Sequence, residues 1–491
     1  MLEDLINERI KKRDAFIAAG HDPYPARVPR THAISDVLAK FDMLSAGQKT
    51  VKVAGRITGK RGHGGIFFLD VRDGGDAVQV VGKSDDLNDF TLFQENLDIG
   101  DFISVTGQVF ETKSGEPSIA AKKIILAGKS MRPAPSEWYG LSDVETRLRS
   151  RYLEFIVDPG ARELFVKKNR FWNAWRSELV KNDFLEVETP VLESSPGGAD
   201  AEPFVTHHNA LGIDLYLRIS LELPQKKLLV GGYEKIFELG RVFRNEGIDN
   251  EHLQDYTQME FYWAYADYEE LMVLVEKLYK KAVQETTGGL KTIWQGQEID
   301  WEREWPRLEY YDLFKKMVGL DLEKTSREEL LAEVKKRQLD APAELGCGRL
   351  IDLLYKKIVR PTLIQPSFLI HPPADVEPLA KRAAGLPGRV ERIQVVACGT
   401  ELGKGFSECN DPADQRARFE EQMRLREAGD KEAQRLDEDF LEALEYGMPP
   451  AAGFGLSERL FAILMDKPVR ETVFFPVMRP RDNEKNKKLE K

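Results

Sequence analysis

Short alternating strands between Val51 and Leu126 restrict the fold of this chain more than any other feature of its sequence. Apolar and polar residues alternate, and glycines interrupt them, in VKVAGRITGKRG, GGIFFLDVRDGG, AVQVVGK and DFISVTGQVFETKSGEPSIAAKKIILAG. Alternation with a period of two places successive side chains on opposite faces of a strand. Five such strands within about 75 residues fit a small antiparallel barrel of the OB-fold kind, which often binds single-stranded nucleic acid.

The length of the chain implies further domains. With 491 residues it is too long for one ordinary domain. Apolar residues at helical spacing predict a helical arm at 1–45, ahead of a barrel that we place at 46–130. Two prolines and little periodicity indicate a linker at 131–150. A larger domain follows at 151–491, with an insertion around 270–385.

Targeting signals and cysteine patterns are absent from the sequence. No apolar run approaches the roughly 18 residues of a membrane span, and the N-terminus MLEDLINERIKKRDAF contains acidic residues instead of an apolar segment. We therefore expect a cytoplasmic protein without a membrane partner. Cys347, Cys398 and Cys409 show no CxxC or Cys/His spacing, which argues against a disulfide framework or a zinc site.

The charge distribution permits a nucleic-acid partner despite a formal net charge of -11. Phosphate contacts require Lys and Arg. Residues 1–150 carry as many basic as acidic residues, so the whole excess of negative charge lies after residue 150. Local patches therefore matter more than the total.

An arginine two residues before a glutamate stands out in the stretch 238–268, ELGRVFRNEGIDNEHLQDYTQMEFYWAYADY. If Arg244 and Glu246 lie on one strand, both side chains project from the same face. The arginine can then hold a phosphate or carboxylate, and the glutamate can accept from an adenine amino group. The pair predicts a nucleotide site.

This layout resembles motif 2 of the class II aminoacyl-tRNA synthetases, and the flanking GGYEKIFELG and MEFYWAYADY resemble their lysyl-tRNA synthetase branch. The segments FLEVETPVL and GFGLSERLFAILMDKPVRETVFFP resemble motifs 1 and 3, so the resemblance covers nearly the whole chain. It implies an α+β protein. A five-stranded OB-fold that binds the anticodon precedes a catalytic domain with an antiparallel sheet flanked by helices.

Site residues follow from the resemblance, position by position. It implies that L-lysine binds at Gly198, Glu222, Arg244, Glu260, Tyr262 and Glu408, with Glu222, Tyr262 and Glu408 around the ε-ammonium. It implies that ATP binds at Arg244, Glu246, His252, Glu401 and Arg459, with Arg244 and Arg459 as catalytic residues and Glu401 as the Mg²⁺ ligand. In the barrel, Phe68 and Gln79 match the positions that contact the anticodon, and Arg56, Lys60 and Arg61 would contact phosphates. On residue type alone, each of these glutamates is more often a member of a surface ion pair.

The implied activity is ATP-dependent attachment of L-lysine to tRNA(Lys) through a lysyl-adenylate, by a homodimer that associates through motif 1. For the residues of motif 1 alone, an internal helix and strand are an equally good interpretation. The helical arm is either a solvated amphipathic face or a contact for the tRNA backbone.

The chain departs from the family pattern at four places near phosphates or metal. Gln394 replaces a usual glutamate, Lys404 a usual asparagine and Glu251 a usual arginine, and motif 3 is about one residue short before Arg459. Two alternatives to this activity are open, and the departures support only the first of them. One is an RNA-binding paralogue with weakened or lost aminoacylation, and the other is a synthetase of altered specificity for Asp or Asn.

Overall fold

The chain forms two compact units in the computed structural model, residues 1–161 and 162–491, which we call the barrel unit and the sheet unit. The structure describes residues 2–133, 143–247, 252–341, 345–427 and 433–480. Each unit has its own core, and each is described separately below.

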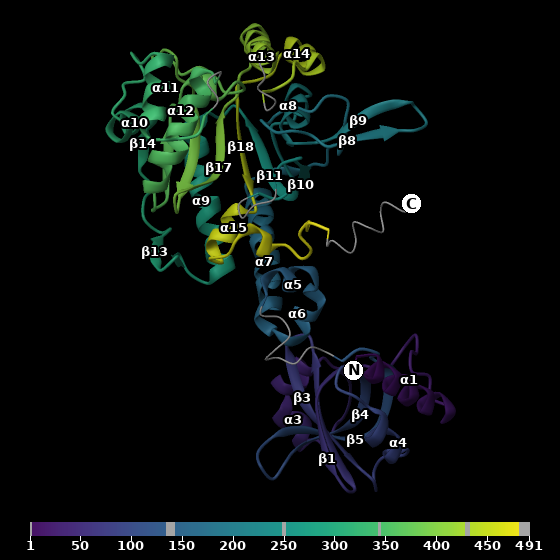
Figure 1. Ribbon diagram of the computed structural model, residues 1–491. Helices are drawn as coiled ribbons and strands as arrows, with labels where there is room; N and C mark the ends of the chain where they lie inside the picture. The colour runs from purple at the N-terminus through teal and green to yellow at the C-terminus, as the bar shows by residue number, and fades with distance from the viewer. Residues whose placement is uncertain (1, 134–142, 248–251, 342–344, 428–432, 481–491) are drawn as a thin grey trace. The chain divides into compact units, whose positions relative to one another are not determined.

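Five strands close into a barrel in the order β1-β2-β3-β5-β4 (Figure 1). They are β1 (Thr50–His63), β2 (Ile66–Asp73), β3 (Asp76–Lys83), β4 (Phe102–Glu111) and β5 (Pro117–Gly128). The β3–β5 pair is parallel and the other neighbours are antiparallel. The predicted OB-fold barrel is confirmed.

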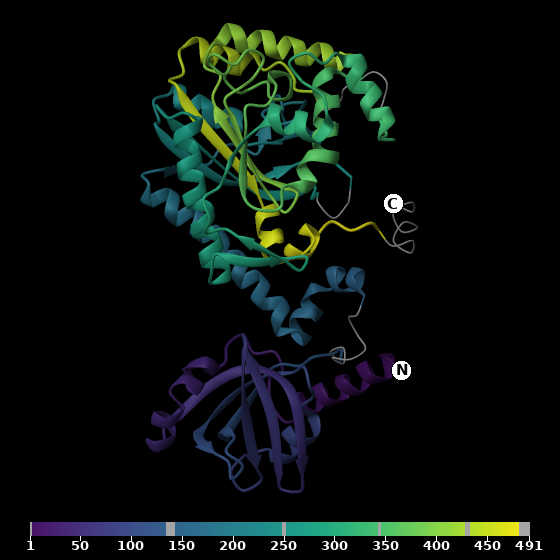
Figure 2. The ribbon, with the colours of Figure 1, turned by 90° about the vertical axis from the view of Figure 1, so that its left-hand side faces the viewer.

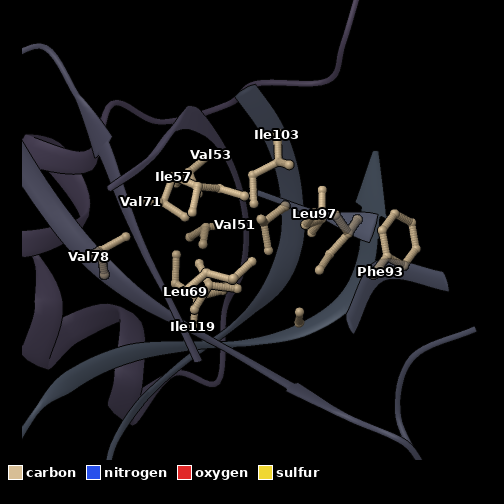
Figure 3. Close-up of a cluster of buried hydrophobic side chains, with 14 of the residues drawn as sticks. Val51, Val53, Ile57, Leu69, Val71, Val78, Phe93, Leu97, Ile103 and Ile119 are labelled. Atoms are coloured by element: carbon tan, nitrogen blue, oxygen red, sulfur yellow. The ribbon is translucent and has the colours of Figure 1, made fainter. Parts of the chain in front are cut away.

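The core of the barrel follows from the alternation in its strands. Inward-facing Val51, Val53, Leu69 and Ile103 are fully buried (Figure 3). Phe67 also points inward and is 1 % exposed, whereas its neighbour Phe68 is partly exposed. One residue of the phenylalanine pair is therefore core, as period-two geometry requires.

Helices of the barrel unit surround and follow the barrel. They are α1 (Leu2–Ala18), α2 (Ile34–Ala39), α3 (Phe41–Ala46), α4 (Phe90–Asn96), α5 (Val144–Arg149) and α6 (Arg151–Val157). The arm helix α1 packs on α4, with the Phe16 and Phe93 rings 5.7 Å apart between centroids. The part of the expected linker that is described after residue 142 forms α5.

The described strands of the sheet unit include one eight-stranded sheet in the order β14-β15-β16-β17-β18-β11-β10-β6. These are β6 (Leu185–Glu186), β10 (Lys235–Phe243), β11 (Asp255–Ala264), β14 (Arg307–Glu309), β15 (Ser367–Ile370), β16 (Arg392–Ala397), β17 (Thr400–Ser407) and β18 (Ala451–Ser457). The antiparallel sheet predicted above is correct for the six central strands, but edge strands β6 and β14 run parallel to their neighbours.

Two smaller sheets and the helices complete the sheet unit. The small sheets are β7 (Leu192–Glu193) with β9 (Ile213–Leu217) and β8 (Val205–His208), and β12 (Lys291–Trp294) with β13 (Gln297–Asp300). The α-helices are α7 (Pro159–Lys181), α8 (Glu222–Val230), α9 (Tyr268–Thr287), α10 (Tyr310–Val318), α11 (Arg327–Lys336), α12 (Cys347–Leu354), α13 (Pro412–Glu427), α14 (Glu438–Glu445) and α15 (Arg459–Leu464). Four shorter helical turns are η1 (Tyr355–Val359, a π-helix), η2 (Arg360–Thr362), η3 (Ala374–Val376) and η4 (Val469–Thr472).

Helix α9 covers the central strands β16, β17 and β18 (Figure 2). Asp267 and Glu270 form a capping box at its start, and Gly288 ends it in the left-handed conformation with φ 84°. The opposite side of α9 faces solvent. By packing on these strands, α9 supports the part of the sheet that carries the site residues described in the next section. Within the described ranges, none of the helices combines the length and apolar character that crossing a bilayer requires.

Candidate active site

One cavity of about 730 Å³ opens in the sheet unit, on the face of the sheet formed by β11, β16, β17 and β18. Most site residues expected from the sequence line it. They are Gly198, Glu222, Arg244, Glu260, Tyr262, Glu401, Glu408 and Arg459. Segments up to about 260 positions apart in the chain thus meet in one cleft.

Three carboxylates and a phenol form what we call the acidic end of this cavity: Glu222, Glu260, Tyr262 and Glu408. Glu222 begins α8, Glu260 and Tyr262 lie on β11, and Glu408 follows β17. All four side chains are buried. Burial raises the pKa of both Glu222 and Glu408, and repulsion adds to the rise, from Glu377 at Glu222 and from Glu222 at Glu408. A cation placed among these groups would therefore be stabilised.

Glu260 is held in place by donors on both carboxylate oxygens. Its Oε1 accepts from Ser220 Oγ at 2.9 Å and from the Leu221 N–H at 3.2 Å, and its Oε2 accepts from Tyr262 Oη at 3.0 Å. Burial, followed by the charge of Glu222, raises the pKa of Glu260 to about 7. Glu260 is therefore partly protonated at neutral pH.

A lysine that the sequence analysis did not identify lies behind two of these carboxylates. Lys226 Nζ contacts Glu222 Oε1 at 2.5 Å and also pairs with Glu408 Oε2. Burial lowers the pKa of Lys226, but Glu222 and Glu408 outweigh burial and raise it, so the ammonium stays charged. The i, i+4 spacing of Glu222 and Lys226 on α8 was the available sequence signal.

Glycines create the room at the acidic end. A Cβ at Gly453 on β18 would overlap the Tyr262 ring and lie 2.5 Å from Glu408 Oε1. Gly198 has φ +79°, and a Cβ there would lie 2.9 Å from the Cβ of Glu222. Both positions therefore require glycine, for space at Gly453 and for space and backbone conformation at Gly198.

Cations gather at the other end of the cavity, which we call the cationic end: Arg244, Arg392, Lys404 and Arg459. The Arg244 guanidinium lies over the Tyr256 ring at 5.6 Å, and Arg459 Nη1 donates to the Glu401 carbonyl oxygen at 3.2 Å. Arg459 begins helix α15 directly after β18, as motif 3 predicts. These guanidinium groups are suited to hold an anion such as a phosphate or carboxylate.

Glu401 is anionic because of this surrounding charge. Burial alone would raise its pKa, but the fields of Arg392, Lys404 and Arg459 outweigh burial and lower the pKa to about 2. Gln394 Nε2 donates to Glu401 Oε2, while Gln394 Oε1 accepts from Tyr355 Oη at 2.7 Å. The amide at 394 therefore already occupies one carboxylate oxygen of Glu401.

Lys404 and Arg392 share one further carboxylate. Lys404 Nζ contacts Glu377 Oε1 at 3.0 Å, and Arg392 Nε contacts Glu377 Oε2 at 3.2 Å. Glu377 thereby holds both cations at the wall of the cavity.

The described residues contain no group of three His, Cys, Asp or Glu side chains arranged to hold a metal ion. Mg²⁺ is commonly held by one or two carboxylates together with substrate phosphates. An anionic Glu401 beside the cationic end fits an ion held largely by a bound nucleotide, and it does not fit a site built from protein ligands alone.

Glu246 and His252 do not belong to the lining of this cavity. The sequence prediction placed Arg244 and Glu246 on one strand face, but β10 ends at Phe243. Beyond that point the backbone pairs irregularly, with Arg244 N–H donating to Gln254 O and Asn245 N–H to Glu202 O. The same-face argument is therefore wrong here. The Glu251 departure lies outside the described residues.

The insertion contributes to the lining, which the sequence analysis did not foresee. Arg349 and Asp352 of α12 and Lys356 of η1 line the cavity. Arg349 Nη1 lies 3.4 Å from Asp200 Oδ2 across the cavity wall. The insertion thus forms part of the site, not only of the scaffold.

On the barrel, Phe68 is partly exposed, with the Arg61 guanidinium 5.8 Å from its ring centre. Gln79 is nearly buried, and its Oε1 accepts from Ser118 Oγ at 3.1 Å. Arg56 and Lys60 donate to the carbonyl oxygens of Gly100 and Leu97, so both are bound to backbone of the barrel unit itself.

Comparison with known families gives two matches. The family described as tRNA synthetases class II (D, K and N) matches residues 143–479, and the OB-fold nucleic acid binding domain matches residues 51–127.

Similar proteins match nearly the full length. The lysine–tRNA ligase of Roseiflexus castenholzii is 44% identical over 487 residues, covering 98% of this chain and 100% of the relative. That of Carboxydothermus hydrogenoformans is 42% identical, covering 98% and 99% of the two chains. That of Moorella thermoacetica is 43% identical over 484 residues, covering 98% of each.

Proposed function

The chain belongs to the class II tRNA synthetases, in their lysine–tRNA ligase branch, and from this premise we propose which residues carry each part of the reaction. The enzyme attaches lysine to tRNA in an ATP-dependent reaction. Its cavity has one acidic and one cationic end, and this division of charge is the observation that supports the assignments below.

The acidic end would bind the amino groups of lysine. Glu222 and Glu408 would receive the ε-ammonium, and Glu260, oriented by Tyr262, would receive the α-amino group. Among the described residues, Glu408 Oε1 has no hydrogen-bond donor although it is buried, so it is an acceptor ready for an ammonium. Gly198 would let the substrate approach this wall closely.

The cationic end would bind the lysine carboxylate and the ATP phosphates. Arg244 would contact the carboxylate and the α-phosphate, and Arg459 would bind the terminal phosphate. Glu246 and His252, which follow β10, would act at the rim near the adenine. Fixed guanidinium groups aimed at developing negative charge stabilise a phosphoryl-transfer transition state without reorganisation.

Glu401 would hold Mg²⁺ together with phosphate oxygens, and the ion would neutralise charge on the pyrophosphate. The protein residues bind and orient the substrates. A lysine carboxylate oxygen attacks the α-phosphorus as its bond to pyrophosphate breaks, and the terminal ribose hydroxyl of tRNA then displaces AMP from the carbonyl. Positioning at the two ends of the cavity supplies much of the rate.

The barrel would bind the anticodon, with an unstacked base on Phe68 and the amide of Gln79 reading a base edge. Stacking of one base on an aromatic ring contributes about 1–3 kcal/mol. The partly exposed ring of Phe68 supports this role.

Homodimerisation would use α7 and the segment after η4. Exposed apolar side chains there include Val180, Phe474 and Phe475, and the two phenylalanines line a groove of about 470 Å³. Sedimentation of the wild type and of Phe475→Glu would test this, with a lighter species expected for the variant. We also propose a cytoplasmic location, where tRNA is charged.

Lysine-dependent exchange of pyrophosphate into ATP, measured with each of the twenty amino acids, tests the assignment. We expect exchange with lysine alone. Exchange with only aspartate or asparagine would contradict the assignment. A protein that binds tRNA but shows no exchange would also contradict it, because that is the result expected of an RNA-binding paralogue. The full-length matches to lysine–tRNA ligases and the acidic end favour the lysine enzyme over the RNA-binding paralogue and over an Asp or Asn synthetase.

A further inference from the structure

Lys226 is a fully buried charge for which no part of the reaction above has a role. Its side chain has 0% exposure, and its Nζ lies 5.2 Å from the Phe406 ring centre and 5.9 Å from that of Phe440. Glu222 and Glu408 line the cavity, but Lys226 does not. The ammonium therefore contacts the two carboxylates from behind, on the side away from the substrate.

The net charge of the acidic end, with Lys226 included, can be compared with the charge of the substrate. Glu222, Glu260 and Glu408 can carry three negative charges, and Lys226 carries one positive charge, which leaves an excess of two. A free lysine substrate presents two ammonium groups at neutral pH. The acidic end with Lys226 thus matches the two amino groups of the substrate.

We propose that Lys226 is a positioning residue that sets both the charge and the geometry of the acidic end. It uses Glu222 Oε1 and Glu408 Oε2, and so turns Glu408 Oε1 toward the cavity as the acceptor for the ε-ammonium. Its charge also lowers the pKa of both carboxylates, against burial, which raises it. The inference rests on the proposed function, because it assigns the lysine pocket to this end.

Without Lys226, two carboxylates close together in a buried site would share a proton. Lysine would then have to displace that proton, and its apparent affinity would rise with pH. The other titratable groups near the pair are Glu260 and Tyr262 on β11, Lys404 on β17, Glu377 after η3, and Cys409. Helix α14 contributes the uncharged Phe440.

The test is the pH profile of kcat/KM for lysine in pyrophosphate exchange by full-length Lys226→Met. We expect KM for lysine at pH 7 to rise about 10- to 100-fold, with KM for ATP within twofold of wild type. We also expect the pH at which the profile levels off to move up by at least one unit. Lys227→Met, on the next residue of α8, is the matched control and should retain the wild-type profile.

A second variant separates electrostatics from packing. Lys226→Met combined with Glu222→Gln removes one charge of each sign and restores the excess of two, so its profile should return toward that of the wild type. A raised KM with an unshifted profile in Lys226→Met would overturn the inference, as would a double variant whose pH profile stays shifted as far as that of Lys226→Met. If Lys226→Met does not fold, the profile of the double variant decides. Loss of lysine dependence in the wild type would instead refute the proposed function.

Discussion

Replacing Glu408 with glutamine tests the acidic end most directly, because the change keeps the shape of the side chain and removes its charge. Glu408 lines the cavity, and its Oε1 has no donor among the described residues. A hydrogen bond to a charged group contributes about 1.5–3 kcal/mol, and about 1.4 kcal/mol corresponds to a factor of ten. Glu408→Gln should therefore lower kcat/KM for lysine about 10- to 150-fold.

Pyrophosphate exchange at varied lysine and ATP concentrations measures this effect. KM for lysine should carry most of the loss, and KM for ATP should stay within about twofold, because the cationic end is untouched. Glu420→Gln, at an exposed position of α13, is the control for the loss of one negative charge. A lysine KM within twofold of wild type, in a variant with an unchanged melting temperature, would refute the reasoning.

Three further predictions follow from other parts of the structure. The pKa of Glu260 is about 7, and only its ionised form can accept the α-ammonium. We therefore expect kcat/KM for lysine to fall about tenfold per pH unit below pH 7 and to level off above it. A flat profile from pH 6 to 8 would contradict this. Phe68→Ala should raise KM for tRNA about 5- to 150-fold in aminoacylation and leave pyrophosphate exchange unchanged; an equal loss in both assays would refute a barrel role. Lys404→Asn combined with Gln394→Glu makes the charge around Glu401 two units more negative but restores the usual family residue at both positions, so we expect it to retain at least about half of the exchange activity; collapse of exchange would count against compensation between the two departures.

The barrel was predictable because its information is local. Period-two alternation and glycines at turns determine which side chains of β1 to β5 point inward, so the burial of Phe67 and the partial exposure of Phe68 follow from adjacency alone. The same kind of argument failed at Glu246. It assumed a strand where β10 had already ended, and the backbone bond from Arg244 to Gln254 redirects the chain there.

The site was predictable only through the family resemblance, because its residues are remote in sequence. Glu222, Glu260 and Glu408 come from α8, β11 and the end of β17, and no spacing rule brings these together. Lys226 shows the limit most clearly. Its pairing with Glu222 one turn away is a local pattern, but its second partner arrives 182 positions later and exists only in the folded sheet.

The two ends of the cavity remain oppositely charged because the counter-charges packed against each end neutralise only part of its charge. Lys226 compensates one of the acidic groups, and Glu377 with Glu401 compensates part of the cationic end, so an excess of each sign stays exposed to the cavity. A substrate with a side-chain ammonium at one end and a carboxylate at the other can then bind in only one direction. Norleucine, which has the four side-chain carbons of lysine without the ε-ammonium, would keep the carboxylate contact and leave Glu408 Oε1 buried and unpaired. Since an unpaired buried acceptor costs about 1–3 kcal/mol or more, the orientation of charge is also the basis of selection against neutral amino acids of the same shape.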